Sequence, residues 1–137
     1  MNITLSPREA GALSEVSARA LQGARELSRF QETDPGLAGA CGVEVGALEA
    51  RTILGSGAVG RLWEAGAAAY RSGRPAVVRG EDLEALSRLE GVLALGASRI
   101  GQKVAELDGA QGEDLGAKLS GLISLATGAI GLWKSIF

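Results

Sequence analysis

The stretch Gly80-Glu81-Asp82-Leu83-Glu84-Ala85-Leu86 decides the fold, because it has the pattern of the beginning of a long helix. Its two acidic residues would stand in the first turn, where they complement the positive end of the helix dipole. Apolar residues then recur at a heptad-like spacing, which is typical of helices that pack lengthwise against each other. This stripe consists of Leu86, Leu89, Leu93, Ala97, Ile100, Val104 and Leu107. We expect a helix from Glu81 to Leu107 that packs within the chain or between chains.

Two further segments carry comparable helix starts. In Leu5-Ser6-Pro7-Arg8-Glu9, Ser6 can cap the helix, Pro7 suits its first position, and Glu9 completes a capping box. The spacing predicts a helix from Pro7 to Phe30 with one apolar stripe, formed by Leu13, Val16, Ala20, Ala24 and Leu27. Gly112-Glu113-Asp114-Leu115 opens a last helix that runs to the C-terminus. The last two helices are predicted to form an antiparallel hairpin.

The middle of the chain, from Gly36 to Gly73, is interrupted by glycines and is expected to be irregular. The pattern of apolar residues between these glycines predicts two short helices, at 45–54 and 59–71. We expect the second helix to turn Leu62, Trp63, Ala67 and Tyr70 inward. The apolar connector Ala76-Val77-Val78 is expected to join helices, without a sheet. The predicted fold class is therefore all-α: a small helical bundle with a Gly-rich irregular middle and a C-terminal helical hairpin, forming one domain over residues 1–137.

Composition excludes several functional classes. The chain has 137 residues, 46% of them hydrophobic, and a net charge of −2 with mixed signs. Nucleic-acid binding is not expected, because it normally needs a clustered basic face. The single cysteine, Cys41, lies among Ala and Gly and is expected to be a buried thiol. The N-terminus lacks the pattern of a signal peptide, so we expect a cytoplasmic protein.

The absence of histidine limits the chemistry further. Neither a Ser-His nor a Cys-His pair can form, and no imidazole can bind a metal. The adjacent acids Glu81-Asp82 and Glu113-Asp114 are explained by their places at helix starts. We therefore expect no enzyme, no catalytic residue, no metal and no cofactor.

A glycine motif offers an alternative function. The segment Gly55-Ser56-Gly57-Ala58-Val59-Gly60 has the spacing of a dinucleotide fingerprint after an apolar run. The stretch from Thr52 to about Leu86 resembles the first β-α-β unit of ketopantoate-reductase-like NADP enzymes. This resemblance implies an NAD(P)-binding protein in which residues 76–79 form the second strand and Arg79 meets a ribose phosphate. It covers about a quarter of the chain, and the rest shows helical periodicity. The motif equally fits a Gly-rich break between close-packed helices, which we expect.

A second alternative comes from the segment that runs from Leu37 to Leu48, which resembles a helix-turn-helix with Gly42-Val43 at its turn. That resemblance implies a nucleic-acid-binding regulator. The helix that would enter the DNA groove carries Glu44 and Glu49 against a single Arg51, which is a poor complement to phosphates.

The C-terminal segment is the most apolar part of the chain, with no charge between Lys118 and Lys134. At the helical rise this run measures about 22 Å, which is shorter than the hydrocarbon core of a membrane. One stripe on it predicts a partner-binding surface, formed by Leu119, Leu122, Ile123, Ala126, Ile130, Trp133 and Phe137. The alternative is that this helix is the central core helix of the bundle. We expect a structural or adaptor protein that acts by self-association or by docking a helical protein partner through this helix and the stripe from Leu86 to Leu107. A membrane surface is a further candidate partner, which would make the protein peripheral to a membrane.

Overall fold

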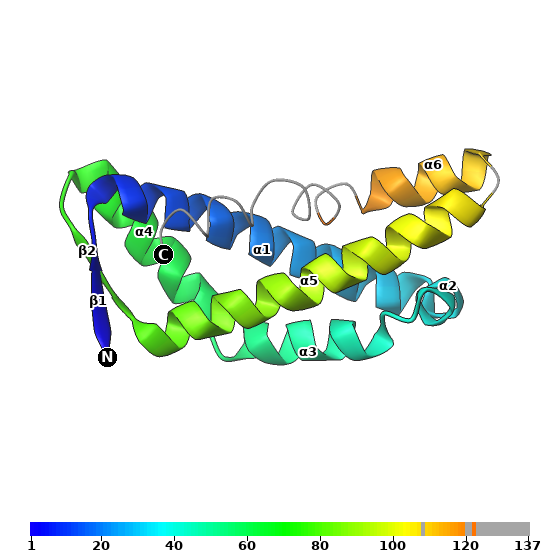
Figure 1. Cartoon of the computed structure of the whole chain (residues 1–137), viewed down its shortest axis with the longest axis horizontal. Coiled ribbons are helices and arrows are strands. Elements are labelled where there is room, and N and C mark those ends of the chain that lie inside the picture. The colour runs from blue at the N-terminus through cyan, green and yellow to red at the C-terminus, as the bar shows by residue number, and fades with distance from the viewer. Residues whose placement is uncertain (108, 120–121, 123–137) are drawn as a thin grey trace.

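The computed structural model describes residues 1–107, 109–119 and 122 and shows a mostly helical protein, so the predicted all-α class is confirmed (Figure 1). In chain order the elements are β1 (Asn2–Leu5), α1 (Pro7–Thr33), α2 (Pro35–Cys41), α3 (Glu44–Gly55), α4 (Ala58–Ser72), β2 (Ala76–Arg79), α5 (Gly80–Glu106) and α6 (Gly109–Lys118). The long helices α1 and α5 run in the same direction along the length of the molecule (Figure 1). The other helices pack around this pair.

The first helix begins as its sequence predicts. The Ser6 hydroxyl accepts a hydrogen bond from the Glu9 amide at 3.2 Å, and the Glu9 carboxylate accepts one from the Ser6 amide at 2.9 Å. This reciprocal pair satisfies two amides that the start of a helix leaves without partners. The helix continues to Thr33, three residues beyond the predicted end, and Asp34-Pro35 then redirects the chain.

Small residues set how closely α1 and α4 approach. The two helices are antiparallel, with Gly66 of α4 lying against Ala10 and Ser14 of α1. A Cβ atom added at Gly66 would lie 2.5 Å from the Ala10 carbonyl oxygen. Such close backbone contact explains why this helix carries glycine in the middle of its buried face.

The close α1–α4 contact corrects the predicted inward face of α4. Leu62 is buried as expected, but Trp63 and Tyr70 are exposed, and Ala67 is only partly buried. Gly66 and Ala69 take the buried places next to Leu62. The prediction assumed that the bulky apolar residues of α4 would be buried. The close contact between α1 and α4 instead has room only for small side chains.

The middle of the chain is more regular than predicted. Residues 36–73 fall almost entirely into α2, α3 and α4, with breaks only at Gly42-Val43 and Ser56-Gly57. Gly42 and Gly57 have φ of +71° and +76°, a conformation that glycine adopts at little cost. Most of the other glycines of this stretch lie inside helices and do not break them.

A two-stranded sheet at one end of the bundle is the main departure from the expected fold (Figure 1). Strand β2 pairs antiparallel with β1, with Ile3 opposite Val78 and Leu5 opposite Ala76. Alternation places Ala76 and Val78 of the connector in the core and turns Val77 outward. The expectation of no sheet is therefore wrong at these eight residues.

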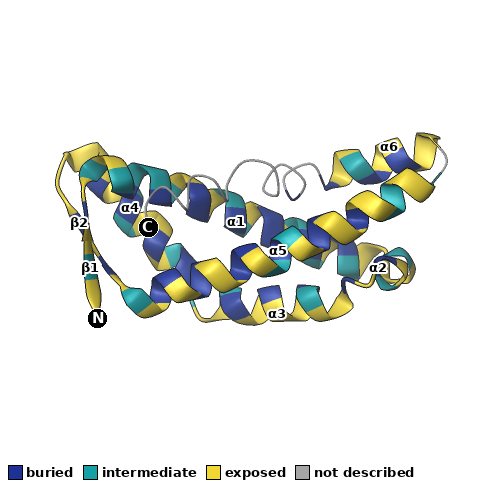
Figure 2. Cartoon of the chain, viewed as in Figure 1, coloured by how far each residue is buried: buried dark blue, intermediate teal, exposed yellow. Residues whose placement is uncertain are grey.

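Most of the stripe from Leu86 to Leu107 is internal. Leu86, Leu89, Leu93 and Ile100 are fully buried within this chain, and Leu107 is partly buried (Figure 2). The part of the stripe from Leu86 to Ile100 therefore packs within the chain, whereas Val104 and Leu107 at its end are only partly buried. The predicted hairpin is also present in its described part, because α6 folds back on α5, with Gly112 lying against Val104.

The chain repeats one structural plan at an offset of 73 residues, as from Leu13 to Leu86. A four-residue strand precedes a 27-residue helix in both copies, β1–α1 and β2–α5, and each helix ends at a matching residue. The matching buried positions are Ala10 and Leu83, Leu13 and Leu86, Val16 and Leu89, Ser17 and Glu90, Ala20 and Leu93, Gly23 and Gly96, Ala24 and Ala97, and Leu27 and Ile100.

The sheet has the same symmetry. Thr4 and Val77 are equivalent by the offset and also lie directly opposite each other in the ladder. The pair Ile3 and Val78 is likewise equivalent to the pair Ala76 and Leu5. A pseudo-two-fold axis therefore passes through the middle of the sheet and relates α1 to α5.

Candidate functional site

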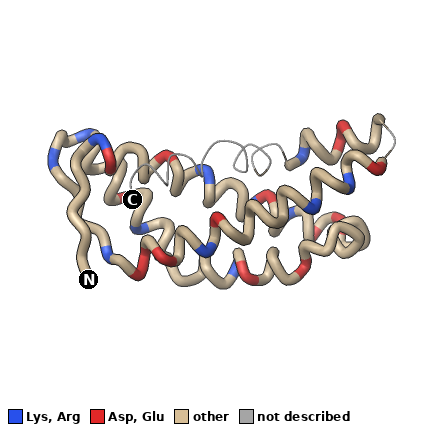
Figure 3. The backbone as a smooth tube through the Cα atoms, in the orientation of Figure 1, with Lys and Arg blue, Asp and Glu red and all other residues tan. Residues whose placement is uncertain are grey.

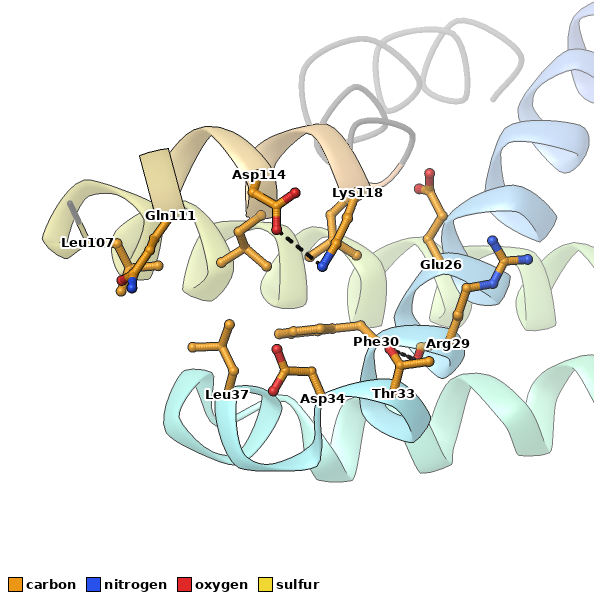
Figure 4. A pocket seen from close by; sticks show the side chains of 12 residues that line it. Glu26, Arg29, Phe30, Thr33, Asp34, Leu37, Leu107, Gln111, Asp114 and Lys118 are labelled. Atoms are coloured by element: carbon orange, nitrogen blue, oxygen red, sulfur yellow. Dashed lines mark hydrogen bonds and ion pairs between the residues drawn. The ribbon is translucent and has the colours of Figure 1, made fainter. Parts of the chain in front are cut away.

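A hollow lies where the end of α1, α2, the end of α5 and α6 meet (Figure 4). It is a cavity of about 720 Å³, within the usual size of ligand pockets. Phe30 lies between the two sides of this groove, with α6 on one side and Leu37 of α2 on the other (Figure 4). Apolar side chains form its floor: Phe30, Leu37, Leu107, Leu115 and Leu119.

Local sequence explains how these elements meet. Phe30 stands in the last turn of α1, and the Asp34 amide donates to its carbonyl oxygen at 2.9 Å as the helix ends. Pro35 occupies the first position of α2, where its missing amide proton is not needed. The short helix therefore turns sharply away from α1 and places Leu37 beside the groove.

Charges of both signs form the rim of the groove. Asp114 and Lys118 form an ion pair at 3.1 Å on the surface of α6. Glu26 accepts a hydrogen bond from the Leu122 amide at 2.6 Å, which joins Leu122 to α1. Acidic and basic residues are also interspersed along the rest of the described backbone (Figure 3). The groove therefore suits an apolar ligand more than a highly charged one.

The structure describes two of the seven predicted partner-binding residues. Leu119 lines the groove and Leu122 lies nearby, and both are fully buried in the core of the chain. The other five, Ile123, Ala126, Ile130, Trp133 and Phe137, lie outside the described residues. The groove itself was not foreseen, because four elements from distant parts of the sequence contribute to it.

The glycine motif forms a break between two helices, as expected. Residues 53 and 54 lie in α3, Ser56 ends that helix, and α4 begins at Ala58. The fingerprint of the NADP enzymes instead follows a strand. Strand β2 pairs antiparallel with β1, so the parallel β-α-β unit that the resemblance implies is not present among the residues placed by the structure.

Two arginines near this motif form ion pairs within the chain. Arg61 binds Asp82 through two hydrogen bonds, of 2.9 and 3.1 Å, and so joins the first turns of α4 and α5. The Asp82 carboxylate raises the pKa of the Arg61 guanidinium. Arg79, which the resemblance assigns to a ribose phosphate, pairs with Glu81 at 2.6 Å. The Arg61–Asp82 pair could not be predicted from local spacing, because the two residues are 21 positions apart and lie on different helices.

The segment from Leu37 to Leu48 does fold as two helices joined by a turn at Gly42-Val43. The first of them has only seven residues. The outer face of α3 presents Glu44, Val45, Leu48 and Glu49, while Arg51 pairs with Glu32 at 3.2 Å. An acidic and apolar face of this kind does not match a phosphate backbone.

Three polar side chains are buried inside the bundle, and their burial was not predicted from the sequence. Ser17 and Glu90 are buried at equivalent positions of α1 and α5, and Asp82 is buried through its pair with Arg61. Burial raises the pKa of Glu90 to about 7. Cys41 is buried, as expected, and burial raises the pKa of its thiol, which disfavours the reactive thiolate.

Comparison with known protein families, with curated proteins and with solved structures finds no match for this chain. Over the described ranges, no cluster of three or more Cys, Asp or Glu residues is arranged to hold a metal ion. None of the helices in those ranges is both long and apolar enough to cross a membrane.

Proposed function

We propose that this protein is an adaptor that works by docking an apolar helix of a protein partner, without a catalytic step of its own. The contact surface is the groove together with the part of the predicted C-terminal stripe that follows the buried Leu119 and Leu122, which is Ile123, Ala126, Ile130, Trp133 and Phe137. A second copy of the chain can also supply the docked helix.

The observation that carries this proposal is the composition of the groove. Its floor is apolar and its rim carries both signs of charge, which is the usual arrangement of an apolar core and a polar rim at protein interfaces. Leu37 and Leu107 are only partly buried there, so part of the floor is open to a ligand. A docked helix would remove these side chains from water, at about 25 cal/mol per Å² of apolar surface.

Sedimentation velocity of the full chain, alone and with candidate helical partners, tests the proposal. Leu37→Asp and Leu107→Asp are expected to abolish association, because each puts a charge on the apolar floor. Ile130→Glu with Trp133→Glu is expected to do the same from the C-terminal stripe. Val77→Asp is the matched control, since Val77 is an exposed apolar residue on the sheet at the far end of the bundle.

Two outcomes would contradict the proposal. The proposal would be contradicted if the parent protein sediments as a monomer and binds none of the helical partners tested. Binding that occurs only with lipid vesicles, and that survives the Leu37 and Leu107 changes, would favour a membrane surface as the partner instead.

A further inference from the structure

Helices α3 and α5 share a second apolar surface, separate from the groove. On α3, Val45 and Leu48 are 77% and 64% exposed, and on α5 Leu95 is 54% exposed. Val92 lies between the two helices, partly buried against Gly46. We call these four side chains, Val45, Leu48, Val92 and Leu95, the α3–α5 patch.

Three of the four side chains of the patch surround one hollow. Val45, Val92 and Leu95 line one depression of about 310 Å³ between the two helices. Leu48 lies three residues after Val45, and residues at that spacing share one face of a helix. Scattered single apolar residues are normal on a surface, but a contiguous patch around a depression is typical of a contact site.

The internal repeat provides a control for this patch. The positions of α1 that match Val92 and Leu95 are Arg19 and Gln22, both polar. Helix α1 has the same length as α5 and shares eight buried positions with it. Val92 has a partner within the chain, because it packs against Gly46. Leu95 is exposed, so packing within the chain does not explain its apolar side chain.

The charges at the patch indicate what covers it. Glu49 of α3 and Arg99 of α5 also line the depression, and Arg99 donates a hydrogen bond to the Gly42 carbonyl oxygen. In a two-fold interface, residue i of one copy meets residue j of the other, and j meets i. One patch that carries both an acid and a base next to an apolar centre can complement itself in this way, forming the Glu49–Arg99 pair twice.

We propose that the α3–α5 patch is the contact surface for a second copy of this chain, in a two-fold dimer. Leu48 and Leu95 pack against their counterparts at the centre. Glu49 of each copy pairs with Arg99 of the other at the edges. This dimer leaves the groove at α6 open, so the two surfaces act independently.

Analytical ultracentrifugation of the full chain over a concentration series tests the inference. Leu48→Glu and Leu95→Glu are each expected to raise the dimer dissociation constant by about tenfold or more, because a charge would be buried against an apolar surface. Val77→Glu, at a residue that is 60% exposed on β2, is the matched control and is expected to leave the constant unchanged. Circular dichroism checks that each variant keeps its helices.

Exchange of the two charges separates a contact between copies from a structural role. Glu49→Arg alone places two bases at each edge and is expected to weaken the dimer. Glu49→Arg combined with Arg99→Glu is expected to restore it, because each pair regains opposite charges. A double variant that keeps its helices but does not recover the dimer would contradict the pairing.

The parent protein being monomeric at every concentration would overturn the inference. A dimer that survives both leucine substitutions would overturn it as well. A dimer that is lost in Leu37→Asp and Leu107→Asp, but kept in the patch variants, would overturn this inference while supporting association through the groove. A dimer lost only in the patch variants supports the inference and leaves the groove to its own test.

Discussion

Replacement of Glu90 by glutamine is expected to stabilise the protein at neutral and alkaline pH. The Glu90 side chain is buried in the bundle, with a residue exposure of 4%, and its Oε1 atom has no hydrogen-bond partner among the described residues. Burial disfavours the charged carboxylate and raises the pKa from 4.5 to about 7. The folded protein therefore holds a proton at this site that the unfolded chain releases.

The sign of the pH dependence follows from this difference. Between pH 4.5 and about 7 the folded state binds more protons than the unfolded state, so the free energy of unfolding falls as the pH rises through this window. The two pKa values differ by about 2.5 units, which corresponds to about 3 kcal/mol. This part of the free energy of unfolding is fully present below the unfolded pKa and is lost as the pH rises through the folded pKa. Glu90→Gln removes this dependence, because an amide does not titrate.

Urea unfolding followed by circular dichroism, at several pH values from about 4 to 8, measures the effect. The useful quantity is the difference in free energy of unfolding between parent and Glu90→Gln, because other carboxylates titrate equally in both. We expect this difference to change by about 3 kcal/mol across the window in favour of the variant. Glu84→Gln, an exposed change on the same helix, is expected to show no such change. A constant difference between parent and Glu90→Gln at all pH values would refute the reasoning.

Four further predictions concern local packing and the glycine motif. Gly66→Ala is expected to destabilise the protein by about 1–3 kcal/mol in urea unfolding, because its Cβ would clash with the Ala10 carbonyl oxygen. Gly60→Ala has open space and is expected to stabilise α4 by about 0.5–1 kcal/mol, so equal effects of the two changes would contradict the packing. Ser6→Ala is expected to cost about 1 kcal/mol through loss of the capping box, and an unchanged urea midpoint would argue against that cap. Calorimetric titration with NADP is expected to show no heat of binding, whereas micromolar binding that is lost in Gly57→Ala would restore the nucleotide-binding interpretation.

Features that depend on neighbouring residues were predictable from the sequence. The start of α1 at Ser6-Pro7 and the start of α5 at Gly80 follow from local end chemistry and agree with the periodicity of the residues behind them. The break at Ser56-Gly57 was predictable for the same reason, since only a few residues decide it. Local signals of this kind give helix boundaries to within a few residues.

Features that depend on distant residues were not predictable. Strand β1 has four residues, and its partner lies more than seventy positions away, so no local pattern indicates it. The orientation of Trp63 was predicted wrongly because the sequence does not show that Gly66 lets α1 and α4 approach closely. The groove likewise needs four elements in place before Phe30 and Leu37 face a common cavity.

The pairing of β1 with β2 has a consequence during synthesis. Once Leu5 has been added, the ribosome must add about seventy more residues before Ala76 can pair with it, which takes several seconds at the usual rate of about 5–20 residues per second. Helices α1, α2, α3 and α4 all precede β2 in the chain, so they are made before the sheet can form. The nascent chain meanwhile carries a strand with unpaired backbone amides, which is a site for pairing with a neighbouring chain. The sheet therefore cannot form until β2 has been made, and crowded polysomes are where strand β1 is most exposed to pairing with a neighbouring chain.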